Sequence, residues 1–161
     1  MIIDPQVARR EFISFHNDED TLRIEQQIQQ NGIDLRLANL EKLLGADIAI
    51  RPAEKELCNR WVCKGDHWIL WPGNVYEVRF EESVVIPPGV AATIHPRSSF
   101  VRNGVFMWSG LYDAGFEGQI GCFLKVLGPS RIRIDKGDRM AQIVFQEANG
   151  SAIYAGEWKR R

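Results

Sequence analysis

Residues 95–100, HPRSSF, place a guanidinium group and two hydroxyl groups side by side at the end of an apolar run. A strand that simply turned at this point would more often use Gly, Asn or Asp. Arg97, Ser98 and Ser99 instead offer hydrogen-bond donors that suit phosphate oxygens, and Arg102 adds a second cation. If the segment begins a short helical turn, its free N–H groups favour the same anion. The alternative is a pair of capping serines flanked by two surface arginines.

A second segment, 109–121 (SGLYDAGFEGQIG), contains four glycines around one aspartate, Asp113. Glycine at this density permits tight hairpin turns or a close approach of the backbone to a ligand. A carboxylate at the floor of such a pocket could act as a general base on water. The alternative is that Asp113 caps the hairpin turn.

A third segment, 136–145 (KGDRMAQIVF), is a turn that leads into a strand. Arg139 and Gln142 are the polar residues at the start of that strand. The amide of Gln142 either faces solvent or donates to a phosphate.

The elements that must position these segments are mostly β-strands. GIDLRLA alternates three apolar residues, Ile33, Leu35 and Leu37, with Asp34 and Arg36, which indicates a strand with one buried face. Further β-type runs recur between turns rich in Gly and Pro: WVC, HWILW, VYEVRF, ESVVIPPGVAATI, QIGCFLKV, RIRI and MAQIVF. Short strands at this spacing predict an all-β sandwich or barrel.

One short helix is expected near the N-terminus, with Asp4 as its N-cap and Pro5 at its first position. Its apolar stripe is expected to comprise Val7, Phe12 and Phe15. The helical period then mostly disappears. We therefore expect a single domain, 1–161, with an N-terminal helix and turn over 1–20 and a tail over 150–161 that needs a partner to become ordered.

The overall composition excludes several classes of protein. With 20 basic and 21 acidic residues among 161, the chain has a net charge of −1, which does not suggest a nucleic-acid partner. No apolar run approaches the roughly 20 residues that span a bilayer, and the N-terminus lacks the layout of a signal peptide, so we expect a cytoplasmic protein without a membrane partner. Cys58, Cys63 and His67 have a loose spacing for a metal and lack a fourth ligand, which favours free thiols.

Four segments together, in this order, resemble the motifs of the trimeric dUTPase and dCTP deaminase superfamily: QQNGIDLRL, HPRSSFVRNG, GLYDAGFEG and GDRMAQIVF. The resemblance covers roughly residues 22–158. It implies a dUTPase-like β-clip, a distorted jelly-roll barrel, in a homotrimer whose active sites lie between subunits.

The branch of the family depends on one position. The deaminases and the bifunctional members carry a glutamate ten residues after the aspartate of the third motif, and here that position is Phe123. A phenyl ring cannot transfer protons, and Glu117 lies in the presumed turn. The resemblance therefore implies a dUTP diphosphatase that releases dUMP and pyrophosphate. A dCTP deaminase or bifunctional enzyme is the alternative.

The resemblance also implies roles for particular residues. Asp113 would orient and deprotonate a water for in-line attack on the α-phosphorus, while Mg²⁺ on the triphosphate reaches Asp34 through a water. The phosphates would be positioned by Ser98, Ser99, Arg102 and Gln142. Arg97 would bind the substrate or brace the site across the interface. The backbone around Gly110 and Tyr112 would read the uracil edge.

The ring of Phe116 either packs beneath the deoxyribose and excludes a 2′-hydroxyl, or belongs to the core. The usual dUTPases carry an acidic residue where Gly115 stands, and they end in a Gly-rich motif that this chain lacks. Its basic end, Lys159, Arg160 and Arg161, either closes over the γ-phosphate or is a solvated tail. A third possibility is a non-catalytic dUTP-binding sensor, because a fold does not fix a function.

Overall fold

The computed structural model describes residues 1–16, 19–45, 50–51, 54–55, 57–150 and 152–156. Its elements, in chain order, are α1 (Pro5–Glu11), β1 (Ile13–Ser14), α2 (Thr21–Glu25), β2 (Ile33–Leu43), β3 (Ile50–Arg51), β4 (Glu54–Lys55), β5 (Arg60–Val62), β6 (His67–Leu70), β7 (Val75–Val85), β8 (Val90–Pro96), α3 (Ser98–Arg102), β9 (Val105–Trp108), β10 (Glu117–Val126), β11 (Ile132–Asp135) and β12 (Arg139–Glu147).

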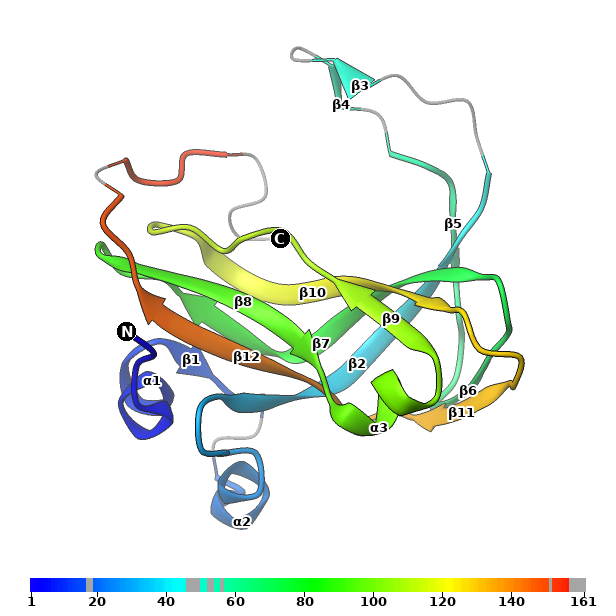
Figure 1. Cartoon of the computed structure of the whole chain (residues 1–161), viewed down its shortest axis with the longest axis horizontal. Helices are drawn as coiled ribbons and strands as arrows, with labels where there is room; N and C mark the ends of the chain where they lie inside the picture. Colours follow the sequence, from blue (N-terminus) through cyan, green and yellow to red (C-terminus); the bar gives the residue numbers. More distant parts are fainter. Residues whose placement is uncertain (17–18, 46–49, 52–53, 56, 151, 157–161) are drawn as a thin grey trace.

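The main sheet has the strand order β8–β12–β2–β7–β10–β9, and all of its pairs are antiparallel. It curls almost into a closed barrel (Figure 1), because a bridge between Ala92 and Tyr112 joins the segment after β9 back to β8. The predicted all-β barrel is therefore confirmed. The β10 ladder with β7 shifts register between Gln119 and Gly121, next to the pocket described below.

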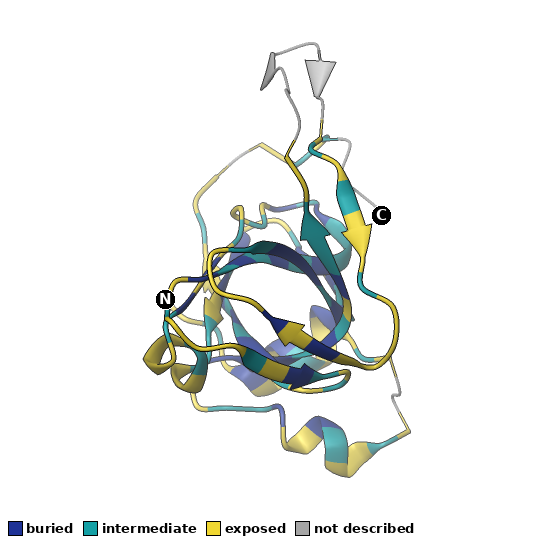
Figure 2. Ribbon diagram, turned by 90° about the vertical axis from the view of Figure 1, so that its right-hand side faces the viewer, coloured by how far each residue is buried: buried dark blue, intermediate teal, exposed yellow. Residues whose placement is uncertain are grey.

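The strands form because their apolar residues alternate. In β7, Tyr76, Val78 and Phe80 are buried in the barrel, and every second residue between them is polar. In Figure 2, buried residues (dark blue) alternate with more exposed ones (teal and yellow) along the strands that enclose the barrel. Each large side chain buried there contributes about 1.5–3 kcal/mol, so this alternation specifies the register of the sheet.

The predicted start of the first helix is confirmed. The Asp4 carboxylate accepts a hydrogen bond from the Gln6 backbone N–H at 2.7 Å, and a proline occupies the first turn of α1. The predicted stripe is partly wrong, because α1 ends at Glu11 and buries Ala8, while Val7 is 41% exposed. The five-residue helix α2 was not expected from the sequence.

The short α3 follows β8 directly, as the segment after His95 predicted. In the described part of the chain, no helix has the length and apolar character needed to cross a bilayer.

Candidate active site

The first group of predicted site residues gathers where β8 runs into α3. A pocket of about 330 Å³, which we call the serine pocket, is lined by Gln29, Asp34, Pro96, Arg97, Ser98, Ser99 and Gln142. Both serines are exposed in the first turn of α3, and their hydroxyl groups make no hydrogen bond to the described part of the protein. The residue at the N-cap position is Arg97, without a side-chain cap, so neither serine is the capping residue.

A buried carboxylate orients the arginine of this pocket. Asp34 is 2% exposed, and its Oδ2 lies 3.2 Å from Arg97 Nε and 3.3 Å from Arg139 Nη1. Burial raises the pKa of Asp34, and the two arginines oppose that shift only in part. Arg97 Nη1 also donates to the Arg139 carbonyl at 3.1 Å, so its guanidinium is fixed from two sides.

The sheet brings the first and fourth motifs together. Gln142 of β12 lies opposite Asp34 of β2 in the ladder, and its amide interacts with the buried carboxylate. Gly32 allows this close approach, because a Cβ there would lie 2.6 Å from the Ile143 carbonyl and 2.7 Å from Cγ of Gln142. The glycine before β2 therefore allows the chain to pack closely against β12 beside Gln142.

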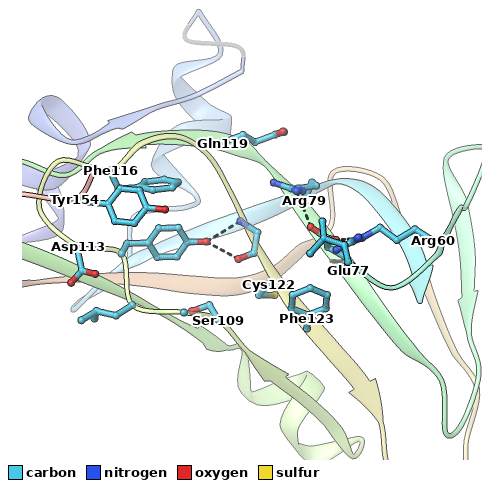
Figure 3. Close-up of a pocket in the computed structure, with 15 residues that line it drawn as sticks. Arg60, Glu77, Arg79, Ser109, Asp113, Phe116, Gln119, Cys122, Phe123 and Tyr154 are labelled. Atoms are coloured by element: carbon cyan, nitrogen blue, oxygen red, sulfur yellow. Dashed lines mark hydrogen bonds and ion pairs between the residues drawn. The ribbon is translucent and has the colours of Figure 1, made fainter. Parts of the chain in front are cut away.

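The second group of predicted residues lines a different pocket, of about 350 Å³, which we call the aromatic pocket. Its described lining includes Asp113 with the predicted Gly110, Tyr112 and Phe116. Figure 3 shows Asp113 near one end, beside Phe116 and Tyr154. This volume falls in the range of small-ligand sites.

The loop that carries Asp113 is tightly held. The Gly115 N–H donates to the Ile86 carbonyl at 2.7 Å, and the Phe116 N–H donates to the Asp113 carbonyl at 3.0 Å. Gly115 has φ +90°, which favours glycine at this turn. Phe116 is 8% exposed and packs edge-on against Tyr112. The Asp113 side chain remains exposed at the pocket mouth, so water can reach it.

The described part of the C-terminal segment, residues 152–156, lies on the same loop. The Tyr154 N–H donates to the Ala114 carbonyl at 2.6 Å, and the Tyr154 ring lies 6.0 Å from that of Phe116. These residues therefore contact their own chain without a partner. The predicted role of Lys159, Arg160 and Arg161 falls outside the described residues.

Three polar residues at the other end of the aromatic pocket were not identified from the sequence: Arg60, Glu77 and Arg79. Arg60 Nε lies 2.5 Å from Oε2 of Glu77, and Arg79 Nη2 lies 2.8 Å from Oε1. Glu77 is the cross-strand partner of Phe123. The VYEVRF run already placed Glu77 and Arg79 on one face, but only the pairing of β7 with β10 directs that face to the pocket.

The two pockets share no lining residue, and they lie at the two ends of the chain segment that contains β9. Arg102 is exposed at the end of α3 and lines neither of them. Within one chain, Asp113 therefore lies in a different pocket from most of the residues predicted to bind phosphate.

The described residues include no group of three or more His, Cys, Asp or Glu side chains that could hold a metal. Of the candidates named from spacing, His67 pairs with Asp135 at 2.8 Å, and Cys58 and Cys63 are free and half-buried.

The family model for dCTP deaminase-like proteins matches residues 7–148, which is most of the chain and includes the lining of both pockets except Tyr154. The chain belongs to the dCTP deaminase-like family. The resemblance seen in the four motifs is thereby confirmed.

Relatives in the dCTP deaminase-like family carry two kinds of name. The chain is 35% identical over 142 residues to deoxyuridine 5′-triphosphate nucleotidohydrolase of Methanocaldococcus jannaschii, covering 85% of this chain and 90% of that protein. It is 34% identical over 140 residues to the probable nucleotidohydrolase of Aeropyrum pernix, covering 82% and 84%. A dCTP deaminase of Halorubrum lacusprofundi is 32% identical over 138 residues, covering 80% and 68%.

A solved member with the same fold is the 2′-deoxycytidine 5′-triphosphate deaminase from Agrobacterium tumefaciens, with a TM-score of 0.71 and 22% identity. The match covers 91% of this chain, and the chain spans about half, 48%, of that structure. At this identity the likeness shows the fold of the dCTP deaminase-like family alone.

Proposed function

We propose that this protein hydrolyses dUTP to dUMP and pyrophosphate. The observation that carries the proposal is the exposed carboxylate of Asp113 at the mouth of the aromatic pocket, combined with a phenyl ring at position 123. A water beside Asp113 would lose its proton to the carboxylate as it attacks the α-phosphorus. The names of several relatives as dUTP nucleotidohydrolases support the same reaction.

The aromatic pocket would hold the nucleoside. Phe116 presents a buried ring beside Asp113, where a deoxyribose would lie between the base and the reacting phosphate. A 2′-hydroxyl against that ring would lose its hydrogen bonds to water without gaining others, and this would disfavour UTP.

The serine pocket would hold the triphosphate. Ser98 and Ser99 supply hydroxyl donors, and Gln142 supplies an amide donor. Arg102, exposed at the end of α3, would add a positive charge from outside the pocket. Arg97, tied to Asp34, would act as a fixed cation at the back of the pocket.

Mg²⁺ would enter as part of the substrate, bound to the triphosphate. The two guanidinium groups on Asp34 make its carboxylate a poor partner for a third cation, so we assign Asp34 to orienting Arg97 instead. Bound to the phosphates, Mg²⁺ would offset part of the negative charge of the triphosphate. The attacking water and the Asp113 carboxylate could then approach the α-phosphorus with less repulsion.

A complete site would form between subunits of a homotrimer. The serine and aromatic pockets are separate in one chain, so the serine pocket of one subunit would need to face the aromatic pocket of another. This arrangement would place phosphate donors beside Asp113.

Deamination of dCTP is the second candidate, because Glu77 places a carboxylate in the aromatic pocket directly opposite Phe123. Its two oxygens are ion-paired with Arg60 and Arg79, so this carboxylate already holds two arginines together at the wall of the pocket. This arrangement favours hydrolysis over deamination.

The test incubates purified protein and Mg²⁺ with dUTP or dCTP, and measures pyrophosphate, nucleotide products and ammonia. Pyrophosphate and dUMP from dUTP, with dCTP unchanged, are the expected result. Ammonia from dCTP would establish the deaminase instead. Binding of dUTP without any product would identify a sensor.

A further inference from the structure

The aromatic pocket occupies a gap in the β9–β10 hairpin. The ladder between these strands ends at the pair Trp108–Phe123. Beyond it the chain leaves β10 and joins β8 instead, where the backbones of Tyr112 and Ala92 exchange two hydrogen bonds of 2.9 Å. This edge of β10 therefore faces the pocket instead of a strand.

The backbone of Gly121 lies on that edge, and one side chain satisfies both of its polar groups. The Tyr112 hydroxyl donates to the Gly121 carbonyl at 2.7 Å and accepts from the Gly121 N–H at 3.1 Å. A glycine is required here, because a Cβ would lie 2.5 Å from the Val78 carbonyl. Burial raises the pKa of Tyr112 to about 12, so the phenol keeps the proton that it donates at neutral pH.

We propose that the nucleotide base displaces the Tyr112 hydroxyl on binding and takes over its two hydrogen bonds to the Gly121 backbone. Tyr112 is then a specificity-determining residue. This inference rests on the proposed function. The N3–H and C4 carbonyl of uracil are adjacent, and they offer one donor and one acceptor, as the phenol does. A base that lacks either group would leave one polar group of Gly121 unpaired. With the Tyr112 phenol in place, both groups are paired, so such a base would not displace it.

The exchange opposes binding. In the free protein, the Gly121 backbone is hydrogen-bonded to Tyr112 and not to water. The nucleotide therefore has to displace two hydrogen bonds within the protein. Without the Tyr112 hydroxyl, the Gly121 backbone is hydrogen-bonded to water in the free protein. The free-energy cost of displacing the phenol is then absent from binding. Two hydrogen bonds of ordinary net strength correspond to about a tenfold change in affinity or somewhat more.

Calorimetry with a non-hydrolysable imido analogue of dUTP tests the proposal on Tyr112→Phe. We expect about tenfold tighter binding than in the wild type. Tyr76→Phe is the matched control, because it removes a phenol that accepts from the Trp71 N–H at 3.0 Å and does not line the pocket. Unchanged or weaker binding by Tyr112→Phe would overturn the proposal and return the hydroxyl to a structural role.

A second measurement needs no variant, which matters if Tyr112→Phe does not fold. The imido analogue methylated at N3 cannot donate to the Gly121 carbonyl, so the wild type should bind it at least tenfold more weakly. Equal binding of the two analogues would show that Gly121 does not read the base. Wild-type protein that neither binds the unmethylated analogue nor hydrolyses dUTP would instead refute the proposed function, and this inference with it.

Discussion

At the scale of single residues, Asp113 and Asp34 show how environment separates two carboxylates. Asp113 is exposed beside an aromatic pocket, where a water can reach it and no arginine pairs with it in the described structure. Asp34 is buried and engaged by two arginines. The first therefore suits proton transfer, and the second suits the positioning of a cation.

Asp113→Asn tests the assignment of the base. The amide keeps the size of the side chain but cannot accept a proton from water, so turnover should fall by about 10²–10⁴-fold. Binding of the imido analogue should change little, because the shape of the pocket is kept. Pyrophosphate release and calorimetry measure the two effects, with the exposed Asp66→Asn as a control outside both pockets. Normal turnover by Asp113→Asn would remove Asp113 from the mechanism.

Ser98→Ala and Arg102→Ala test the assignment of the phosphate donors. Each side chain would supply a charge-assisted hydrogen bond to the triphosphate, so each loss should weaken binding of the imido analogue about 10- to 100-fold. Arg10→Ala on α1 removes a surface charge elsewhere and serves as the control. If both variants bind as tightly as wild type, Ser98 and Arg102 are surface residues of a structural turn.

At the scale of elements, a buried polar network fixes β2 against β7 and the segment that follows α2. Gln27 Nε2 donates to the Asp34 carbonyl at 2.7 Å and to Oε1 of Glu82 at 2.6 Å. Oε2 of Glu82 accepts from the Arg36 N–H at 3.1 Å. Because the Asp34 backbone belongs to this network, the geometry of the serine pocket depends on the position of Gln27 just after α2, which no motif of the sequence indicated.

This network predicts a pH dependence of stability. Burial raises the pKa of Glu82 to about 7. The folded state then holds a proton that the unfolded chain has released, so the contribution of Glu82 to stability decreases as pH rises from about 4.5 to about 7. The full effect is at most about 3 kcal/mol. In Glu82→Gln, the melting temperature should change less over this interval than in wild type or in the exposed control Glu147→Gln. Parallel pH curves for the three proteins would contradict this assignment.

At the scale of the whole molecule, the sequence allowed the strands and the four motifs to be predicted. Alternation in β2 and β7 gave the buried faces, and Asp4 with Pro5 gave the start of α1. The polar end of the aromatic pocket could not be predicted, because Glu77 meets Phe123 only through the pairing of distant strands. The same holds for the Tyr112 hydroxyl on Gly121, which requires the hairpin to open.

The proposed assembly of each site from two chains predicts the activity of mixed oligomers. Asp113→Asn damages only the aromatic pocket, and a Ser98→Ala/Arg102→Ala double variant damages only the phosphate donors. When the two variants are co-expressed equally, half of the aromatic pockets and half of the serine pockets are intact. If each site combines pockets from two chains, about one quarter of the sites (½ × ½) should regain activity. If each site lies within one chain, no mixed trimer contains an intact site. Pyrophosphate release by the purified mixture, compared with each variant alone, decides between these arrangements. Activity no higher than that of the separate variants would place the whole reaction in a single subunit.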